Sequence, residues 1–171
     1  SNQSDIENPT GLALSGEVED FKTQITFPPK GERKETIDVQ GATQTATVAF
    51  TAQGLSKYSR DKNAEIDQTV APVIIDNRTK QVINPKADGY YVIPGEGKYK
   101  VTPNGNNVDI EFTPEDNFVG TASGITIRRT DDNGYTTDWV SKDKTLLPSI
   151  NEVMDSMDGL YIPTVTPKNI E

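Results

Sequence analysis

Apolar and polar residues alternate along much of the chain, most clearly over residues 95–134. Alternation with period two is typical of a β-strand that has one buried and one solvated face. The alternating apolar positions on the two sides of a turn at residues 104–107 are Tyr99, Val101, Val108, Ile110 and Phe112. We predict a hairpin in which these residues face one another, with Lys98 and Lys100 opposite Asp109 and Glu111. A third strand at Ile125 and Ile127 is expected to complete a β-meander.

The same alternation predicts strands in five other places. They cover residues 21–27, 43–51, 70–75, 81–83 and 90–93. The first is expected to end at Pro28-Pro29 and to be followed by a charged loop from Lys30 to Glu35, since proline cannot donate to a strand ladder. The polar residues 76–80 predict a hairpin turn, and residues 54–67 a long surface loop. Residues 125–127 are expected to pair with residues 135–140 across Asn133-Gly134, a dipeptide favoured in type I′ turns.

Residues 141–159 do not follow this alternation. Leu147, Ile150, Met154 and Met157 recur at helical spacing, and Gly159 follows where a helix would end. Ser149 and Glu152 also have the spacing of a capping box. We therefore predict an all-β, antiparallel β-sandwich-like module with one short helix inserted near the C-terminus.

Five sequence segments follow one another along the chain. They are VQGATQTATVAFTA at 39–52, PVIIDNRTKQVINP at 72–85, GEGKYKV at 95–101, FTPEDNFVGTAS at 112–123 with DDNG at 131–134, and YIPTVTP at 161–167. Together they resemble the CshA-type fibril repeat of Gram-positive cell-wall-anchored surface adhesins. The resemblance implies a β-sandwich-like segment of a surface fibril on the bacterial cell surface, extracellular and anchored to the cell wall through regions outside this segment.

The resemblance also predicts how the chain is divided. Residues 1–38 are expected to be an N-terminal extension or linker with one strand. Residues 39–171 are expected to form one CshA-type repeat-like β domain, in which the helical insertion 141–159 departs from the family pattern.

The composition narrows the classes of function. The chain has 26 acidic and 17 basic residues, a net charge of −9, no histidine and no cysteine. An acidic chain is a poor partner for nucleic acid or an anionic membrane, and no apolar run is long enough for membrane insertion in this segment. The missing residue types remove disulfides, thiolate metal sites and most designs for proton transfer near neutral pH.

Carboxylates are the remaining candidates for chemistry. A glycosidase needs two carboxyl groups at a set separation, and Glu115-Asp116, Asp131-Asp132, Asp155 and Asp158 supply such groups. Both adjacent pairs stand in turn sequences, where short polar side chains cap the backbone, so a structural role is favoured and no catalytic residue or cofactor is predicted. Asp131, Asp132 and Asn133 are weak candidates for a calcium site, because EF-hand spacing is missing.

Two other candidates are weighed against structural roles. Lys22 and Asn169 could form an intramolecular isopeptide bond, but Lys22 falls on the polar side of its strand pattern and Asn169 in a terminal tail. Tyr135 and Trp139, on one face of a predicted strand, are weak candidates for contact with a sugar, alongside Tyr90, Tyr91 and Tyr161. Core packing is the favoured role, because the chain has few large apolar residues.

The leading hypothesis is a non-enzymatic structural and adhesive module of a bacterial surface fibril, either a stalk spacer or part of a host-binding region. Its expected partners are neighbouring repeat modules of the same chain. The alternative is direct binding of a host matrix glycoprotein such as fibronectin, or of a glycan. A third hypothesis is an accessory domain of a polysaccharide-active enzyme.

Overall fold

The computed structural model describes residues 27–58, 61–138 and 157–168, and these residues form strands and loops without a helix. The all-β, sandwich-like class predicted from the sequence is therefore confirmed. Most of the predicted helical insertion lies outside the described residues. Its final residue, Gly159, does not end a helix but opens a strand.

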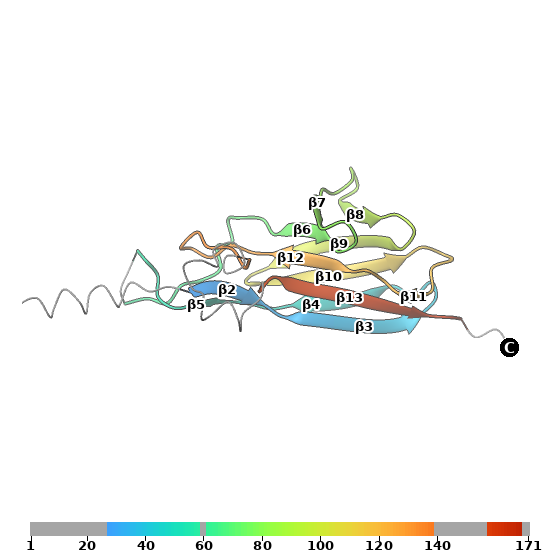
Figure 1. Cartoon of the computed structure of the whole chain (residues 1–171), viewed down its shortest axis with the longest axis horizontal. Helices are drawn as coiled ribbons and strands as arrows, with labels where there is room; N and C mark the ends of the chain where they lie inside the picture. Colours follow the sequence, from blue (N-terminus) through green and yellow to red (C-terminus); the bar gives the residue numbers. More distant parts are fainter. Residues whose placement is uncertain (1–26, 59–60, 139–156, 169–171) are drawn as a thin grey trace, which may run out of the picture.

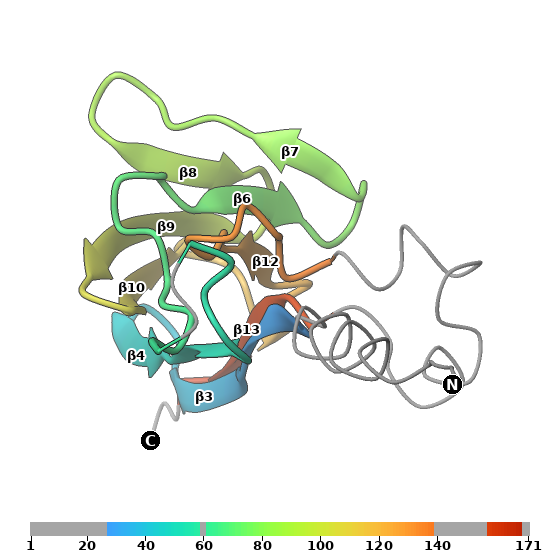
Figure 2. The same cartoon turned by 90° about the vertical axis from the view of Figure 1, so that its left-hand side faces the viewer.

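Two main sheets and a two-stranded ribbon make up the fold. The first sheet has the antiparallel order β4 (Gln44–Val48), β10 (Asn107–Pro114), β9 (Gly97–Asn104) and β8 (Tyr90–Ile93). The second contains β7 (Gln81–Ile83), β6 (Val73–Asp76), β12 (Ile125–Arg128) and β13 (Gly159–Thr166), with β11 (Gly120–Thr121) and β3 (Arg33–Val39) also paired to β13. The ribbon joins β2 (Phe27–Gly31) to β5 (Phe50–Gln53). Figure 2 shows the first sheet on one side and the second on the other.

The core lies between the inner faces of the two sheets. Tyr99 of the first sheet packs against Phe112 at 4.8 Å between ring centroids and meets Tyr161 of the second edge-on at 6.1 Å. All three rings are fully buried. Further core residues include Val48, Ile74, Ile93, Val108, Ile110, Ile125, Ile127 and Val165. Tilted and edge-on ring pairs are favourable arrangements, so the aromatic residues join the two sheets.

The hairpin predicted around residues 104–107 is confirmed. β9 and β10 pair with Tyr99 opposite Phe112 and Val101 opposite Ile110, across a two-residue loop that begins with Gly105 at φ +61°. Lys100 lies opposite Glu111 as predicted. Lys98 lies instead opposite Thr113, and Asp109 opposite Thr102, because the register that pairs Tyr99 with Phe112 and Val101 with Ile110 offsets the two lysines from the two acids by two residues.

The predicted meander is wrong at its third strand. β10 already has β9 on one side and β4 on the other, so β12 lies in the second sheet, between β6 and β13. This placement also excludes the predicted pairing with residues 135–140, because both edges of β12 are occupied. A turn does form here, but its hydrogen bond, from the Gly134 amide to the Asp131 carbonyl at 2.9 Å, encloses Asp132 and Asn133. Asn133 lacks the positive φ that a type I′ turn across Asn133-Gly134 requires. An isolated bridge between Thr130 and Thr136 follows the turn.

The N-terminal predictions also need correction. Pro28-Pro29 lies within β2 rather than ending a strand, and the register of β2 against β5 shifts between Phe27 and Lys30. The prolines thus fall where the ladder is interrupted, where no amide is required. The predicted charged loop from Lys30 to Glu35 is instead the end of β2 and the start of β3. β3 is an edge strand with mostly exposed side chains, so its charged residues remain solvated.

Two other sequence predictions are confirmed. The turn at residues 76–80 joins β6 and β7 in a hairpin, with Asp76 opposite Gln81. β8 ends directly before Pro94-Gly95.

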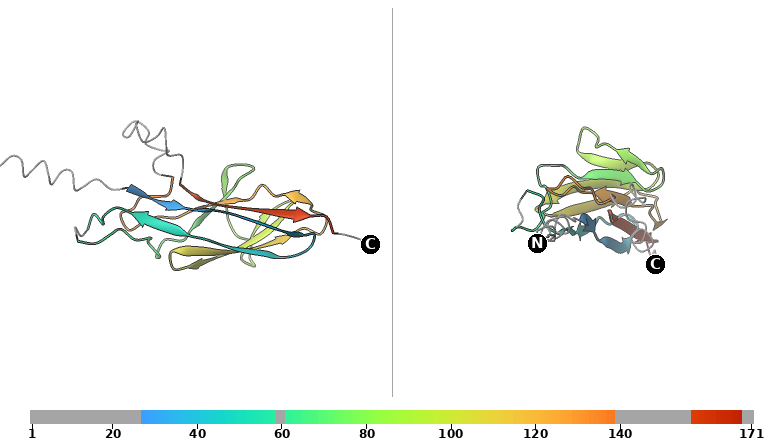
Figure 3. Two further views of the ribbon diagram at one scale, coloured as in Figure 1. Left: turned by 90° about the horizontal axis from the view of Figure 1, so that it is seen from below. Right: turned by 60° about the vertical axis from the view of Figure 1, so that its left-hand side comes forward.

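One strand pair differs from all the others. β3 and β13 are parallel and pair over seven residues, from Arg33 opposite Leu160 to Val39 opposite Thr166. They lie side by side along the long axis of the molecule (Figure 1, Figure 3). β2 lies toward one end of that axis, and β13 ends toward the other (Figure 1).

Candidate binding surfaces

A cluster of charged residues follows β12. The Arg128 guanidinium donates to both carboxylate oxygens of Asp158, at 3.2 and 2.9 Å, and lies 3.2 Å from Asp138 Oδ2. The pKa of Arg128 is raised, chiefly because Asp158 accepts these hydrogen bonds, although burial opposes the shift. The Thr137 hydroxyl also donates to Asp158. Since Arg128 engages both carboxylates, this cluster joins the residue before β13 to β12.

Arg129 is buried, which the sequence analysis missed. The side chain is 1% exposed, and its Nη1 donates to the carbonyls of Asn106 and Asn107 at 3.4 Å. Its guanidinium also lies 5.9 Å from the Phe50 ring centroid. Burial lowers the pKa of Arg129. The signal was present in the alternation itself, because Ile125, Ile127 and Arg129 share one face and the two isoleucines point into the core.

Asp131 and Asn133 organise the turn after β12. Asp131 Oδ1 accepts hydrogen bonds from the amides of Asn133 and Tyr135 at 3.0 and 2.9 Å. The Asn133 side chain accepts from the Lys57 amide at 2.7 Å and donates to the Leu55 carbonyl at 3.0 Å. Burial raises the pKa of Asp131, and the backbone hydrogen bonds oppose that shift.

The weak calcium candidates therefore have structural partners. Both polar atoms of the Asn133 side chain are engaged, while Asp131 Oδ2 and Asp132 Oδ1 are buried without a hydrogen-bond partner. In the part of the chain that the structure describes, no three His, Cys, Asp or Glu residues gather to hold a metal ion. Calcium binding by Asp131, Asp132 and Asn133 stays a prediction.

The candidate aromatic residues are not all on one surface. Tyr161 is buried, and its hydroxyl lies 2.6 Å from Thr36 Oγ1. Tyr135 is half-buried beside the turn, whereas Trp139 lies outside the described residues. Tyr90 and Tyr91 are half-buried on β8. A common sugar platform formed by Tyr135 and Trp139 stays a prediction.

The remaining candidates are the carboxylates Glu115, Asp116 and Asp155 and the isopeptide pair, and the structure describes only some of them. Glu115 Oε2 accepts from the Gly95 amide at 2.9 Å, and the Asp116 carbonyl accepts from the Gln40 side chain at 2.9 Å. These contacts fit the role of a turn. Asp155 and the isopeptide candidates Lys22 and Asn169 lie outside the described residues.

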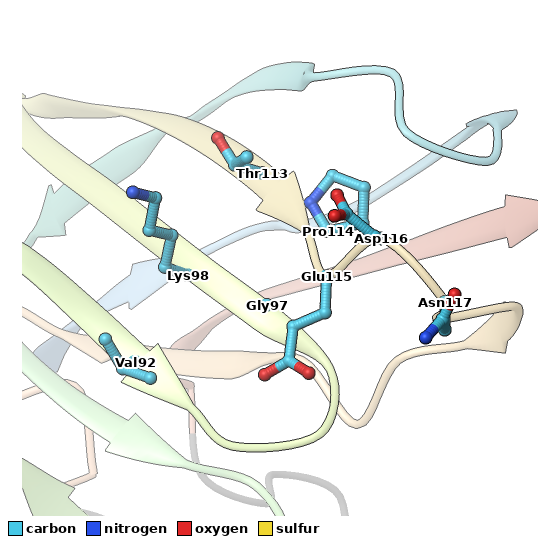
Figure 4. A pocket seen from close by; sticks show the side chains of 8 residues that line it. All are labelled: Val92, Gly97, Lys98, Thr113, Pro114, Glu115, Asp116 and Asn117. Carbon is cyan, nitrogen blue, oxygen red and sulfur yellow. The ribbon is translucent and has the colours of Figure 1, made fainter.

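The outer face of the first sheet carries two shallow hollows. One, of about 480 Å³, is lined by Val92, Gly97, Lys98, Thr113, Pro114, Glu115, Asp116 and Asn117. In Figure 4, Lys98 lies on one side of this hollow and Glu115 and Asn117 on the other. The second, of about 530 Å³, is lined by Thr45, Ala46, Thr47, Lys100, Thr102, Asp109, Ile110 and Glu111. A third hollow, of about 820 Å³, lies over the second sheet, where Arg128 and Asp158 form part of its lining.

Residues 26–140 match the family model of the surface adhesin CshA repetitive domain. The chain belongs to this family. The match begins just before β2 and extends beyond β12, so both sheets of this CshA repeat contribute to it. The predicted resemblance is thereby confirmed, and the chain is a surface-adhesin module with the extracellular surface location that the family implies. No described segment of this CshA repeat forms a helix that could cross a membrane.

Comparison with solved structures finds a chain described as "GspB Siglec domain", to which this CshA repeat is 12% identical with a TM-score of 0.44. The similarity covers 85% of this chain and 61% of that one, so the repeat spans less than two thirds of that chain's length. No curated protein matches the chain.

Proposed function

We propose that this CshA repeat is a non-enzymatic, load-bearing spacer in a bacterial surface fibril that is anchored to the cell wall outside this segment. Its partners in that role are the neighbouring repeat modules of the same chain. The observation that carries the proposal is the parallel pairing of β3 with β13, which are the first and last strands of the second sheet in sequence order.

The direction of the two strands determines how tension acts on them. A pull toward the N-terminus acts at the Arg33 end of β3, and a pull toward the C-terminus acts at the Thr166 end of β13. These are opposite ends of one ladder. The strands are therefore pulled past each other along their lengths, so the paired residues must give way together. A hydrogen bond contributes about 1 kcal/mol net, but rupture of many at once raises the barrier that governs forced unfolding.

Further contacts hold the same two strands. The Gly31 amide donates to the Met157 carbonyl at 2.6 Å and the Leu160 amide to the Glu32 carbonyl at 3.1 Å, so the ladder is continued before β3 begins. At the other end, the Gln40 amide donates to the Thr166 carbonyl at 2.8 Å. These bonds lengthen the region that has to shear.

We call the paired strands β3 and β13 the clamp. Hydrogen bonds of the Thr36 and Gln44 side chains join the clamp to the first sheet. Thr36 Oγ1 donates to Gln44 Oε1 at 2.5 Å, and Gln44 Nε2 donates to the Thr164 carbonyl at 2.9 Å. Gln44 is 4% exposed and belongs to β4. Buried, satisfied polar networks restrict a fold to one arrangement, which suits a spacer of fixed length.

Single-molecule force spectroscopy tests the proposal. One measurement pulls the chain from its two termini and so shears β3 against β13. The other pulls a Thr43→Cys variant from that cysteine and the C-terminus, which peels β13 away from the Val39 end one residue at a time. The cysteine is unique because the chain has none, and Thr43 is an exposed residue in the loop after β3.

The expected rupture force is several-fold higher in shear than in peeling. Both measurements are made on the Thr43→Cys variant, so they unfold one structure with the same thermodynamic stability and the variant serves as its own control. Equal rupture forces in the two directions would contradict a mechanical role for the β3–β13 pair. Negligible resistance to unfolding in both pulling directions would contradict any load-bearing role.

Direct binding of a host matrix glycoprotein such as fibronectin, or of a glycan, is a second proposed function. The observation in its favour is the pair of hollows on the outer face of the first sheet, which the clamp does not use. A role as an accessory domain of a polysaccharide-active enzyme gains no comparable support from the described residues.

A further inference from the structure

Three residues on the outer face of the first sheet form what we call the lysine–tyrosine patch: Tyr90, Lys98 and Lys100. Lys100 pairs across the ladder with Tyr90, and Lys98 lies two residues along β9 on the same face. Lys98 Nζ stands 4.3 Å and Lys100 Nζ 5.8 Å from the centroid of the Tyr90 ring. Both ammonium groups are therefore held over one aromatic ring, which attracts cations.

The two positive charges of the patch are not joined to a carboxylate by an ion pair in the described part of the chain. Neither lysine makes an ion pair within 4.0 Å to any acid in the described ranges, although Lys100 lies across the ladder from Glu111. Since neither ammonium group is farther than 5.8 Å from the same centroid, the two lie within about 10 Å of each other, close to one Debye length in physiological salt. They repel each other, and an anion bound between them would relieve that repulsion.

The surroundings of the patch show which anion fits. The hollow beside Lys100 carries the hydroxyls of Thr45, Thr47 and Thr102 together with the carboxylates of Asp109 and Glu111. The hollow beside Lys98 carries Thr113, Asn117 and two further acids. Hydroxyls and amides can both donate and accept, and carboxylates accept hydrogen bonds from the hydroxyls of a ligand.

The acidic residues around the patch favour some classes of anionic ligand over others. A peptide with a carboxylate on every residue would place some of these groups against the four acidic residues around the two lysines, which would repel them. A neutral sugar would leave the two cations unsatisfied. A sugar chain with separated anionic groups places its charge at the lysines and its hydroxyls at the threonines and acids.

We propose that the lysine–tyrosine patch and its two flanking hollows bind an anionic oligosaccharide that carries carboxylate or sulfate groups. The inference rests on the second proposed function, since it names the glycan class that the same two hollows would bind. It is independent of the clamp, because the patch lies on β8 and β9 and the clamp on β3 and β13. A failure to find mechanical resistance would therefore not contradict the binding proposal. A failure to find binding would not contradict the mechanical role of the clamp.

Isothermal titration of the whole chain tests the proposal with four probes. A hyaluronan hexasaccharide supplies carboxylates and a heparin hexasaccharide supplies sulfates. Chitohexaose is the neutral sugar, and hexaglutamate is the acidic peptide. We expect binding of at least one anionic sugar at or below about 1 mM, weakened by added salt, with the other two probes blank.

A double variant, Lys98→Gln with Lys100→Gln, is expected to weaken that binding by about tenfold or more, because both charges that meet the anion are removed. The matched control is Lys57→Gln with Lys62→Gln. It removes the same charge elsewhere and includes another lysine stacked on tyrosine, since Lys57 Nζ lies 5.3 Å from the Tyr58 centroid. Equal thermal midpoints of the two double variants would establish that both are folded.

Four results would overturn the proposal. They are no binding of either anionic sugar, equal binding of chitohexaose, tighter binding of hexaglutamate, and an equal loss of affinity in the control double variant. A preference for the carboxylated or the sulfated sugar identifies which anionic group the lysines bind.

Discussion

Asp131 shows how one buried carboxylate is placed for structure. Its Oδ1 accepts two backbone amides in the turn after β12, while Oδ2 is buried without a partner. Burial therefore disfavours the charged form, and the folded-state pKa is raised above the ordinary 3.8. The sequence analysis placed Asp131 in a turn but did not indicate that the turn would be covered by the loop at residues 55–57.

Two substitutions of Asp131 should have different effects. Asp131→Ala removes the acceptor from two buried amides, which should lower the free energy of unfolding by about 1–3 kcal/mol. Asp131→Asn keeps an accepting oxygen and removes the buried charge, so at pH 7 it should lose much less stability than the alanine variant. Urea denaturation of both variants measures the difference.

The pH dependence gives a further check on Asp131. Because its pKa is higher in the folded chain than in the unfolded chain, the folded state gains a proton first as the pH falls. The wild type should therefore gain stability relative to Asp131→Asn as the pH falls through the raised pKa toward 3.8. An unchanged difference between the two proteins across this range would contradict the raised pKa.

Among the elements, the start of β13 packs closely against its neighbours because of two glycines, Gly159 in β13 and Gly31 at the end of β2. A Cβ at Gly159 would stand 2.6 Å from the Phe50 ring and 2.9 Å from Val48 Cγ1, and a Cβ at Gly31 would stand 2.6 Å from the Gly159 backbone nitrogen. Phe50 and Val48 are buried, so neither can move aside easily. The two glycines thus let β13 approach β2 and β5 closely.

Gly159→Ala should therefore lower the free energy of unfolding by about 1–3 kcal/mol through overpacking, as measured by chemical denaturation. Gly89→Ala gives a comparison of the opposite kind, because Gly89 has φ +90° and no atom within 4 Å of its Cβ position, whereas Gly159 is crowded and does not have a positive φ. The Gly89 variant isolates the backbone strain of alanine at positive φ. A loss well below about 1 kcal/mol for Gly159→Ala would show that β13 can shift away from Phe50 and Val48 without penalty.

Elements with local partners were predictable from the sequence, and elements with distant partners were not. The β9–β10 and β6–β7 hairpins follow from alternation and a nearby turn. The positions of β12 and β3 depend on β13, which enters the sheet beside them from far along the chain. The charge of Lys30 to Glu35 suggested a loop because the sequence does not reveal that β3 would be an edge strand. The lysine–tyrosine patch likewise requires the register of β8 against β9, which alternation alone does not fix.

On the scale of the whole molecule, the first residues of the described chain pair with strands later in the sequence. β2 and β3 come from residues 27–39, and they pair with β5 and β13. The predicted division of the chain between residues 38 and 39 is untested, and this pairing provides a test. Without β3, the edge of β13 and the Tyr161 hydroxyl would lose their partners.

We expect a chain of residues 39–171 to show no cooperative thermal unfolding, since it would leave backbone groups of β13 and β5 unpaired. A chain of residues 26–171, which begins where the family match begins, is the control and should unfold in one transition. Circular dichroism and calorimetry measure both. Equal transitions in the two chains would place the start of the folded unit at residue 39.

The central position of β13 also sets an order of events during synthesis or export. β13 joins β3 on one edge to β11 and β12 on the other, yet it is the last strand to emerge. Until it arrives, β3 has no partner in the second sheet and the inner face of the first sheet has no complete cover. The repeat is therefore expected to remain unfolded, and able to pass through a narrow channel, until its final residues are free. The strand that would carry the load in the finished fibril is thus also the one whose arrival lets the module fold.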